Sequence, residues 1–358
     1  MFQSVRFQHF KRFDDLEIPL SPITLIGGKN NVGKSSVLEG LFLFADRSNP
    51  NLFVRQLTWR GLSAIPLEPQ AFWGPFFRNY QLDTPLSIVV KEEGIPSVLE
   101  ISYSEQLEGT AVDITFPSPG QSANSPVVEQ VMFPYAVRIQ YSSGEGLVQT
   151  ATQRFTTSGV QHRVERFDRP ARGAAYIGSK MRVDAAEEAE RFGKLDVEGR
   201  QDFIAQGLRA IDPRVASVST IVLGDRPVLH ADVGIGRKIP VMLLGDGTSR
   251  LLSILLALES TPGGIVLVDE IENGFHYSVV EEVWRAIGAA VARSGCQLVA
   301  TTHSIECLHA ATVALDQQAG APLLSYTRLE ERRDRSLHAV QASVESLLGA
   351  VELNWEMR

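Results

Sequence analysis

Cysteine and long hydrophobic runs are both scarce in this sequence. Only Cys296 and Cys307 occur among 358 residues. Neither belongs to a Cys-x-x-Cys pair or stands beside residues at zinc-ligand spacing, which excludes a disulfide framework and favours a reduced setting. The longest apolar runs, such as Leu251–Leu258, are far too short to span a bilayer, and residues 1–13 lack the apolar stretch of a secretory signal. We therefore expect a cytoplasmic protein without a membrane segment.

An excess of positive charge is absent as well, since 34 Lys and Arg stand against 42 Asp and Glu, a formal charge of −8. Nucleic acid could then be bound only through a local basic surface. The best candidate is the stretch 163–182, whose basic residues outnumber Glu165 and Asp168; they are Arg163, Arg166, Arg169, Arg172, Lys180 and Arg182. A solvated charged strand or loop explains this stretch equally well.

Internal repeats and sustained heptads are missing too, which excludes a long coiled-coil arm. Apolar runs bounded by glycines alternate with helical patterns from about residue 241, and this order predicts βα units in a mostly parallel, buried sheet. Residues 85–90, 97–104, 110–116 and 135–142 alternate like strands of an antiparallel sheet, and 116–130 reads as a Pro/Ser/Gly-rich connector. A helical stretch over 187–213 ends at Asp212-Pro213.

One glycine-rich segment has an informative spacing. Residues 28–35, GKNNVGKS, fit G-x-x-x-x-G-K-[ST] between an apolar strand at 23–27 and a helix from Lys34. In such a loop the backbone N–H groups surround phosphate oxygens, and the helix N-terminus adds positive potential. We predict that Lys34 bridges the β- and γ-phosphates of a nucleotide and that Ser35 ligates Mg²⁺. The predicted nucleotide contacts are Gly28, Asn30, Asn31, Gly33, Lys34, Ser35 and Ser36.

Two further strands end in polar residues. The apolar run 265–268 ends in Asp269 and Glu270, and the strand before residue 301 delivers Thr301, Thr302 and His303. The carboxyl ends of parallel strands form the edge at which open α/β sheets bind ligands. We assign Asp269 to Mg²⁺, Glu270 to the attacking water and His303 to the γ-phosphate or that water, so that Glu270, His303 and Lys34 are the candidate catalytic residues.

The order of these motifs resembles that of ABC ATPases of the RecF and SMC kind, and more closely that of bacterial ATPases related to OLD (overcoming lysogenization defect) proteins. Residues 27–36 are similar to their Walker A, 267–276 to their Walker B and D-loop, and 301–304 to their switch histidine. LGDGTSR, 244–250, resembles their short signature. The opening strands, 5–27, are similar as well.

The resemblance implies an ABC-type P-loop α/β core that uses ATP and Mg²⁺ and works as a head-to-tail homodimer or higher homo-oligomer. It places Lys11 and Arg12 near the nucleotide, and Gly245, Gly247 and Ser249 at the partner subunit's nucleotide. Gly245 stands where transporter signatures carry serine, so only backbone contacts are inferred from it. The Q-loop glutamine stays open between Gln56 and Gln70.

We expect a discontinuous core of residues 1–45 and 235–325, an inserted lobe over 46–234 with an antiparallel sheet and a helical portion, and a tail over 326–358 packed on the core. Only 358 − 303 = 55 residues follow His303, which is too few for the Toprim nuclease domain of full OLD proteins. The sequence thus predicts a slow, dimerisation-dependent ATPase that acts as sensor and scaffold for a separate nuclease or toxin in bacterial phage defence. The alternative is a RecF-like, ATP-dependent DNA-binding protein of DNA repair.

Overall fold

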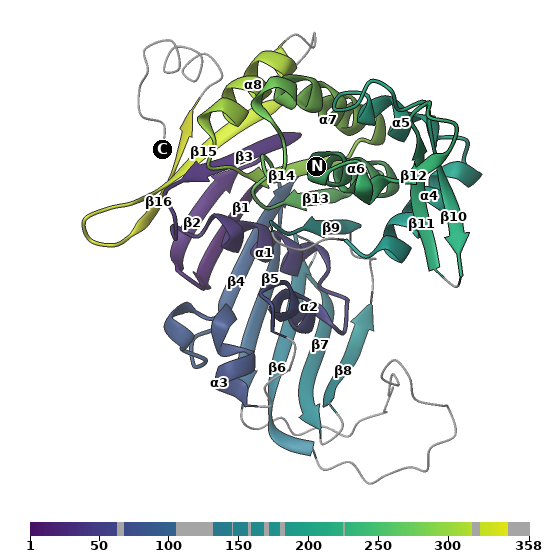
Figure 1. Ribbon diagram of the computed structural model, residues 1–358. Coiled ribbons are helices and arrows are strands. Elements are labelled where there is room, and N and C mark those ends of the chain that lie inside the picture. The colour runs from purple at the N-terminus through teal and green to yellow at the C-terminus, as the bar shows by residue number, and fades with distance from the viewer. Residues whose placement is uncertain are drawn as a thin grey trace, which may run out of the picture. The chain divides into compact units, whose positions relative to one another are not determined.

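The computed structural model describes residues 1–62, 68–104, 132–144, 146–156, 159–167, 172–179, 183–224, 226–316 and 323–342. The chain divides into two compact units, which are coloured along the sequence in Figure 1. Unit 1 comprises residues 1–2, 18–38 and 172–358, and unit 2 comprises 3–17 and 39–171. The predicted strand at 110–116 and the connector at 116–130 lie outside the described residues.

Unit 1 is built on a six-stranded sheet of order β16-β15-β3-β14-β13-β9. Its strands are β3 (Ile23–Gly28), β9 (Ala174–Ile177), β13 (Ile265–Val268), β14 (Gln297–Thr301), β15 (Leu324–Glu331) and β16 (Leu337–Ala342). All neighbours pair in parallel except β15 and β16. Every residue of β13 and β14 is buried, which explains their short, uninterrupted apolar runs.

The helices of unit 1 are α4 (Ala185–Val197), α5 (Asp202–Leu208), α6 (Asp246–Ser260), α7 (Val280–Ser294) and α8 (Ile305–Asp316). Helices α6, α7 and α8 lie side by side in this order, and they form one hydrophobic core with the sheet (Figure 1). Gly295 ends α7 with a φ of 64°, a conformation that glycine adopts without steric cost. A three-stranded sheet, β10 (Ser217–Leu223), β11 (Arg226–Asp232) and β12 (Lys238–Pro240), packs on α4 through β11, and the short helices η3 (Val241–Leu243) and η4 (Tyr277–Val279) precede α6 and α7.

Unit 2 is a seven-stranded sheet of order β2-β1-β4-β5-β6-β7-β8. Its strands are β1 (Phe2–Phe10), β2 (Phe13–Pro19), β4 (Leu86–Glu92), β5 (Ile95–Ser104), β6 (Met132–Ser143), β7 (Gly146–Thr156) and β8 (Gly159–Phe167). The pairs from β4 to β8 are antiparallel, as predicted for residues 85–142. Helices α2 (Leu52–Trp59) and α3 (Pro69–Phe72) and the turns η1 (Gly74–Phe76) and η2 (Arg78–Tyr80) complete it. Helix α1 (Lys34–Ala45) begins in unit 1 and ends in unit 2.

The division into units differs from the predicted one at three places. Residues 172–234 belong with the phosphate loop, because β9 pairs in parallel with β13 and α4 packs on α6. Residues 3–17 and 39–45 belong with the antiparallel unit. Within the predicted tail, residues 326–342 form sheet strands, because β15 pairs in parallel with β3; residues 343–358 lie outside the described part.

The fold class is confirmed: the chain combines a mostly parallel α/β core with an antiparallel sheet and a helical portion. The helical stretch 187–213 is two helices, because the chain turns at Gly199 with a φ of 70°. No helix within the described ranges is long and apolar enough to cross a membrane.

Candidate functional site

The glycine-rich loop connects β3, a central strand of the six-stranded sheet, to the first turn of α1. Three of its residues have a positive φ: 129° at Gly28, 65° at Asn31 and 96° at Gly33. A Cβ atom at Gly28 would stand 2.5 Å from the carbonyl oxygen of Leu329, so this position needs glycine for space as well. The loop therefore has the irregular backbone from which a phosphate cradle is built.

The side chain of Lys34 folds back over this loop. Its Nζ donates hydrogen bonds to the carbonyl oxygens of Gly28 and Lys29, both at 2.8 Å. Burial lowers the pKa of Lys34 below its usual value, and the carboxylates of Asp269, Glu270 and Glu272 oppose that shift. The ammonium group is thus held at the centre of the loop, where a nucleotide phosphate would replace its carbonyl partners.

A hydroxyl–carboxylate cluster joins three elements beside the loop. Ser35 Oγ donates to both carboxylate oxygens of Asp269 at 3.0 Å, and Thr301 Oγ1 donates to Asp269 Oδ1 at 2.6 Å. Ser35 stands in the first turn of α1, Asp269 follows β13, and Thr301 ends β14. Ser35 and Asp269, which are 234 positions apart in the sequence, are therefore in direct contact, and their role as Mg²⁺ ligands stays a prediction.

Glu270, the predicted partner of the attacking water, has a φ of 49°, a left-handed conformation that is strained for a residue with a Cβ atom. Its N–H donates to Thr301 Oγ1 at 2.7 Å, and its Oε2 accepts from Asn273 Nδ2 at 2.8 Å. Thr301 therefore orients both neighbouring acidic residues, one through its carboxylate and the other through its backbone.

His303 lines a cavity of about 300 Å³ together with Gly28, Lys29 and Asn30 of the loop. Its backbone N–H donates to Glu272 Oε1 at 2.6 Å, and the residue is exposed. His303 and the phosphate loop thus line the same cavity. This position is compatible with the predicted role of His303 at the γ-phosphate or the attacking water.

The signature-like turn, residues 244–250, forms the start of α6. Gly245 precedes the helix with a φ of 123°, and a Cβ atom at Gly247 would stand 2.5 Å from the carbonyl oxygen of Gly274. Ser249 Oγ donates to the Gly245 carbonyl at 3.2 Å. The turn therefore packs on the segment that follows Glu270, and the assignment of Gly245, Gly247 and Ser249 to a partner subunit's nucleotide stays a prediction.

The remaining predicted contacts lie in unit 2. Lys11 forms an ion pair with Glu39, and Lys11 and Arg12 line a cavity of about 460 Å³ with Gln56 and Arg60. Of the two Q-loop candidates, Gln56 is buried and donates to the Glu39 carbonyl at 3.0 Å, whereas Gln70 is exposed. The roles of Lys11, Arg12 and either glutamine at the nucleotide remain predictions.

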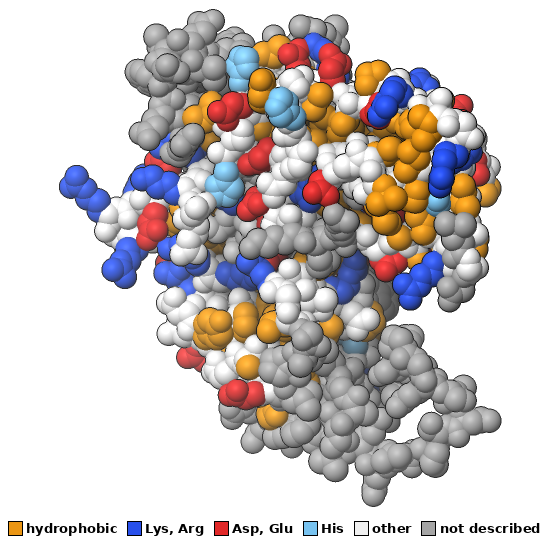
Figure 2. All heavy atoms as spheres, viewed as in Figure 1, with side chains coloured by type: hydrophobic (Ala, Val, Ile, Leu, Met, Phe, Trp, Pro, Cys, Tyr) orange, Lys and Arg blue, Asp and Glu red, His pale blue; other side chains and the backbone are white. Residues whose placement is uncertain are grey.

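The basic stretch 163–182 is divided between the two units, and its proposed role in binding DNA stays a prediction. Arg163 is half-buried on β8 in unit 2, Arg172 lies in unit 1, and 168–171 and 180–182 lie outside the described part. Figure 2 shows basic side chains gathered elsewhere, at the tip of the β15–β16 hairpin, where Arg332, Arg333 and Arg335 are exposed.

The donor set beside the loop fits a Mg²⁺ ion. Among the described residues no group of three or more His, Cys, Asp and Glu could hold a metal ion. Mg²⁺ usually takes one or two protein oxygens, with water and substrate phosphates as its other ligands. The Ser35 hydroxyl and the Asp269 carboxylate offer such a partial oxygen set.

Two residues that bind to this site were not predicted as site residues. Asn273 holds the Glu270 carboxylate, and the Arg250 guanidinium donates to the backbone oxygens of Asp269, at 2.6 Å, and of Glu270, at 3.2 Å. Both lie inside segments that the resemblance covered. Contacts to backbone oxygens leave no pattern in a sequence, so only the position of Arg250 in the signature-like turn could have pointed to it.

Known proteins match this chain in sequence and in fold. The family model "AAA ATPase domain" matches residues 1–106, and the model "AAA domain, putative AbiEii toxin, Type IV TA system" matches 142–308. The "ATP/GTP phosphatase" of Helicobacter pylori (strain ATCC 700392 / 26695) is 26% identical over 306 residues, 78% of either chain.

Among solved structures, the SMC head bound to the C-winged helix domain of ScpA aligns with a TM-score of 0.52 and 12% identity, over 97% of this chain and 99% of that chain. The SMC head domain from Thermotoga maritima aligns with a TM-score of 0.42 and 11% identity, over 96% of this chain and 99% of that chain.

The two ATPase models match the segments that contribute Lys34 and Ser35 on one side, and Asp269, Glu270 and His303 on the other. The SMC head shares its fold with nearly the whole chain. The chain thus carries two segments that match ATPase domain models, within the fold of an SMC head, that is, an ABC-type P-loop ATPase fold.

Proposed function

We propose that this protein hydrolyses ATP slowly, with Mg²⁺, in a homodimer whose closure signals to a separate effector. The observation that carries the hydrolytic part is the cluster in which Ser35 and Thr301 both bind Asp269 while Thr301 also holds Glu270. A loop that only bound phosphate would not need a second acidic residue fixed beside the first.

In this proposal each residue has one task. The loop N–H groups and Lys34 bind the β- and γ-phosphates, and Ser35 and Asp269 would hold Mg²⁺, which when bound neutralises phosphate charge. Glu270 accepts a proton from the attacking water, because it is the neighbouring carboxylate at the same strand end. His303 donates a hydrogen bond to the γ-phosphate across the cavity that it shares with the loop.

A second copy of the chain completes the site. We assign Gly245, Gly247 and Ser249 of one subunit to the nucleotide of the other, in head-to-tail order. The support is the resemblance of residues 244–250 to an ABC signature and the position of these residues at the N-terminus of α6, since helix N-termini carry the positive potential that favours anions. Hydrolysis then depends on protein concentration.

The effector in this proposal is a nuclease or toxin that the ATPase holds or releases in phage defence. Its support is the motif order shared with OLD-like ATPases and the description of the model matching 142–308, which names a toxin of a type IV TA system. The printed activity of the Helicobacter relative supports nucleotide hydrolysis as the signal.

The hydrolytic part is tested with two variants. Lys34→Ala should abolish nucleotide binding in a fluorescent-ATP titration, because the loop loses its one bridging cation. Glu270→Gln should keep binding, lose turnover and trap an ATP-bound dimer in size-exclusion chromatography. If the unmutated protein releases no phosphate from ATP at any protein concentration, the proposal that it is an ATPase is wrong.

The effector part needs the native operon. Purification of the tagged protein from it should yield a second protein in an amount that changes between ATP and ADP, and deletion should raise phage plating efficiency. If no second protein co-purifies and deletion leaves plating unchanged, the defence role is refuted while the ATPase stands.

A further inference from the structure

Arg250 occupies an unusual position: within the described part of the chain, its side chain donates only to backbone oxygens, and these lie at the ends of two neighbouring strands. Nη1 donates to the Gly178 carbonyl, just after β9, at 2.6 Å. Nη2 donates to the carbonyls of Asp269 and Glu270, just after β13, at 2.6 and 3.2 Å. A planar guanidinium with donors in a fixed fork suits such a task, whereas an ammonium would reach fewer of these oxygens.

The strain at Glu270 gives these contacts a purpose. A left-handed conformation is unfavourable for a residue other than glycine and persists only where the surroundings hold it. At Glu270 the N–H is held by Thr301 and the carbonyl by Arg250, so both sides of the strained residue are fixed. Without Arg250, the carbonyl side would keep only the bond from the Asn273 N–H at 3.0 Å.

Arg250 also connects this strained residue to the signature-like turn. It lies in the first turns of α6, three positions after Gly247, where an added Cβ atom would stand 2.5 Å from the Gly274 carbonyl oxygen. The turn thus touches the segment 269–274 at both ends, at Asp269 and Glu270 through Arg250 and at Gly274 through Gly247.

We infer that Arg250 is a positioning residue: it holds the Glu270 backbone in the orientation needed for hydrolysis and ties that orientation to the signature-like turn of the same subunit. The inference rests on the proposed function, in which that turn closes on the partner's nucleotide. When the turn of one subunit closes on the partner's nucleotide, it would then also position Glu270 of its own subunit. The two sites of a dimer would therefore hydrolyse ATP together.

The test compares Arg250→Met, which keeps length without donors, with Arg250→Lys, which keeps the charge. Misplacing a catalytic group by about 1 Å costs on the order of 100-fold in rate, so Arg250→Met should lower kcat by roughly that factor. The Kd for fluorescent ATP should stay within about 3-fold, because the loop is untouched, and Arg250→Lys should recover part of kcat. Arg285→Ala, on the exposed face of α7, is the control and should keep both values.

Hydrogen exchange reports on the position of Glu270 without turnover. In Arg250→Met, amides of peptides covering 269–275 should exchange faster while those covering 28–38 stay unchanged. Unaltered exchange at 269–275, or equal losses of kcat and ATP affinity, would overturn the inference. A parent enzyme without turnover would overturn the proposed function and the coupling, and the exchange data would still decide whether Arg250 holds Glu270.

Discussion

At the scale of single residues, the site depends on a hydroxyl that no motif marks as catalytic. Thr301 is fully buried, donates to Asp269 and accepts from the Glu270 N–H. A hydroxyl can donate and accept at the same time, which a methyl group of the same shape cannot do. Valine at this position would leave the Glu270 N–H without the Thr301 acceptor and would remove one of the two hydroxyl groups that donate to the Asp269 carboxylate.

Thr301→Val should therefore raise the Mg²⁺ concentration needed for half-maximal hydrolysis by about 10–100-fold, the usual effect of losing a residue that orients a metal ligand. A Mg²⁺ titration of the phosphate-release rate measures it. Thr301→Ser keeps the hydroxyl and should stay close to the parent. Equal losses in both variants would mean that the methyl group, and not the hydrogen bond, matters.

The site was predictable from sequence where its chemistry requires a particular residue type at a fixed position of a motif. Lys34 and Ser35 stand at required positions of the loop pattern, and Asp269 follows a buried strand. Arg250 was beyond such reasoning, because its partners are carbonyl oxygens that every residue carries. The strain at Glu270 was equally invisible, since the residue type gives no sign of a φ of 49°.

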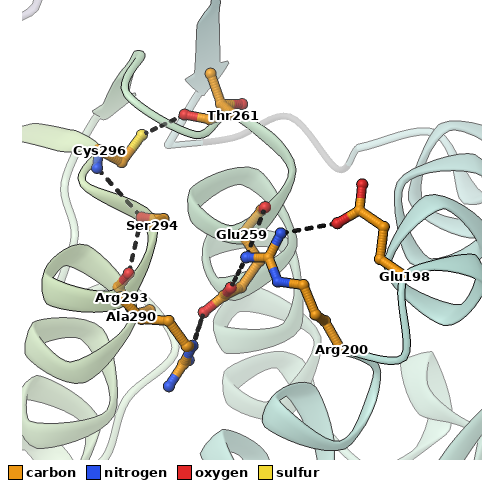
Figure 3. Close-up of polar contacts among 8 residues, drawn as sticks. All are labelled: Glu198, Arg200, Glu259, Thr261, Ala290, Arg293, Ser294 and Cys296. Carbon is orange, nitrogen blue, oxygen red and sulfur yellow. Dashed lines mark hydrogen bonds and ion pairs between the residues drawn. The ribbon is translucent and has the colours of Figure 1, made fainter.

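At the scale of elements, a buried acid joins the ends of two helices in unit 1. Glu259, near the end of α6, is 1% exposed and binds Arg200 Nη2 at 2.7 Å and Arg293 Nε, on α7, at 2.9 Å. Arg200 also forms an ion pair with Glu198. Figure 3 shows the side chains of Arg200 and Arg293 converging on Glu259. A single carboxylate thus compensates two guanidinium groups and fixes α6, which carries the signature-like turn, against α7.

Glu259→Ala should destabilise the protein by about 3–5 kcal/mol, because it leaves two partly buried cations without their partner. A shift of about 2–4 °C in Tm per kcal/mol is typical of this size, so calorimetry should show a loss of roughly 10 °C. Glu190→Ala, which breaks an exposed pair with Lys194, is the matched control and should leave Tm unchanged. An unchanged Tm in Glu259→Ala would mean that the cluster contributes no net stability.

The helices and strands were predictable from sequence where the hydrophobic pattern repeats over enough residues to identify its period. The strand, loop and helix over 23–45 and the alternating strands and helices after 241 follow their hydrophobic patterns. Strand β9 was not predicted, because its apolar run, AAYI, is only four residues long and lies inside a basic stretch. The predicted boundary between core and tail at residue 326 falls inside β15, since only the pairing of β15 with β3, some 300 positions earlier, reveals that the whole strand belongs to the sheet.

At the scale of the whole molecule, the two cysteines report on the integrity of unit 1. Burial raises the pKa of Cys296 to about 11 and that of Cys307 to about 12. Both side chains are buried, and Cys296 Sγ donates to the Thr261 carbonyl at 2.9 Å. Because the thiolate is the reactive form, the folded protein holds both groups inert near neutral pH.

Alkylation with iodoacetamide at pH 8 should therefore be slow until the protein unfolds. The unfolded thiols titrate near pH 8.5 and the folded ones about 2.5 to 3.5 units higher, so unfolding releases protons in this window and stability should fall as pH rises from about 8.5 to 11. Mass spectrometry along a urea titration should show both thiols modified in one step. Rapid modification of either thiol in native buffer would contradict their burial.

The position of β3 has a consequence for synthesis. This strand, which ends in the phosphate loop, lies between β14 and β15, so its two neighbours are made about 270 to 300 residues later. At about 5–20 residues per second, the loop leaves the ribosome many seconds before the strands that hold it. A nascent chain therefore carries the phosphate loop without its neighbouring strands, and we expect ATP to stabilise this protein only once β14 and β15 have been synthesised.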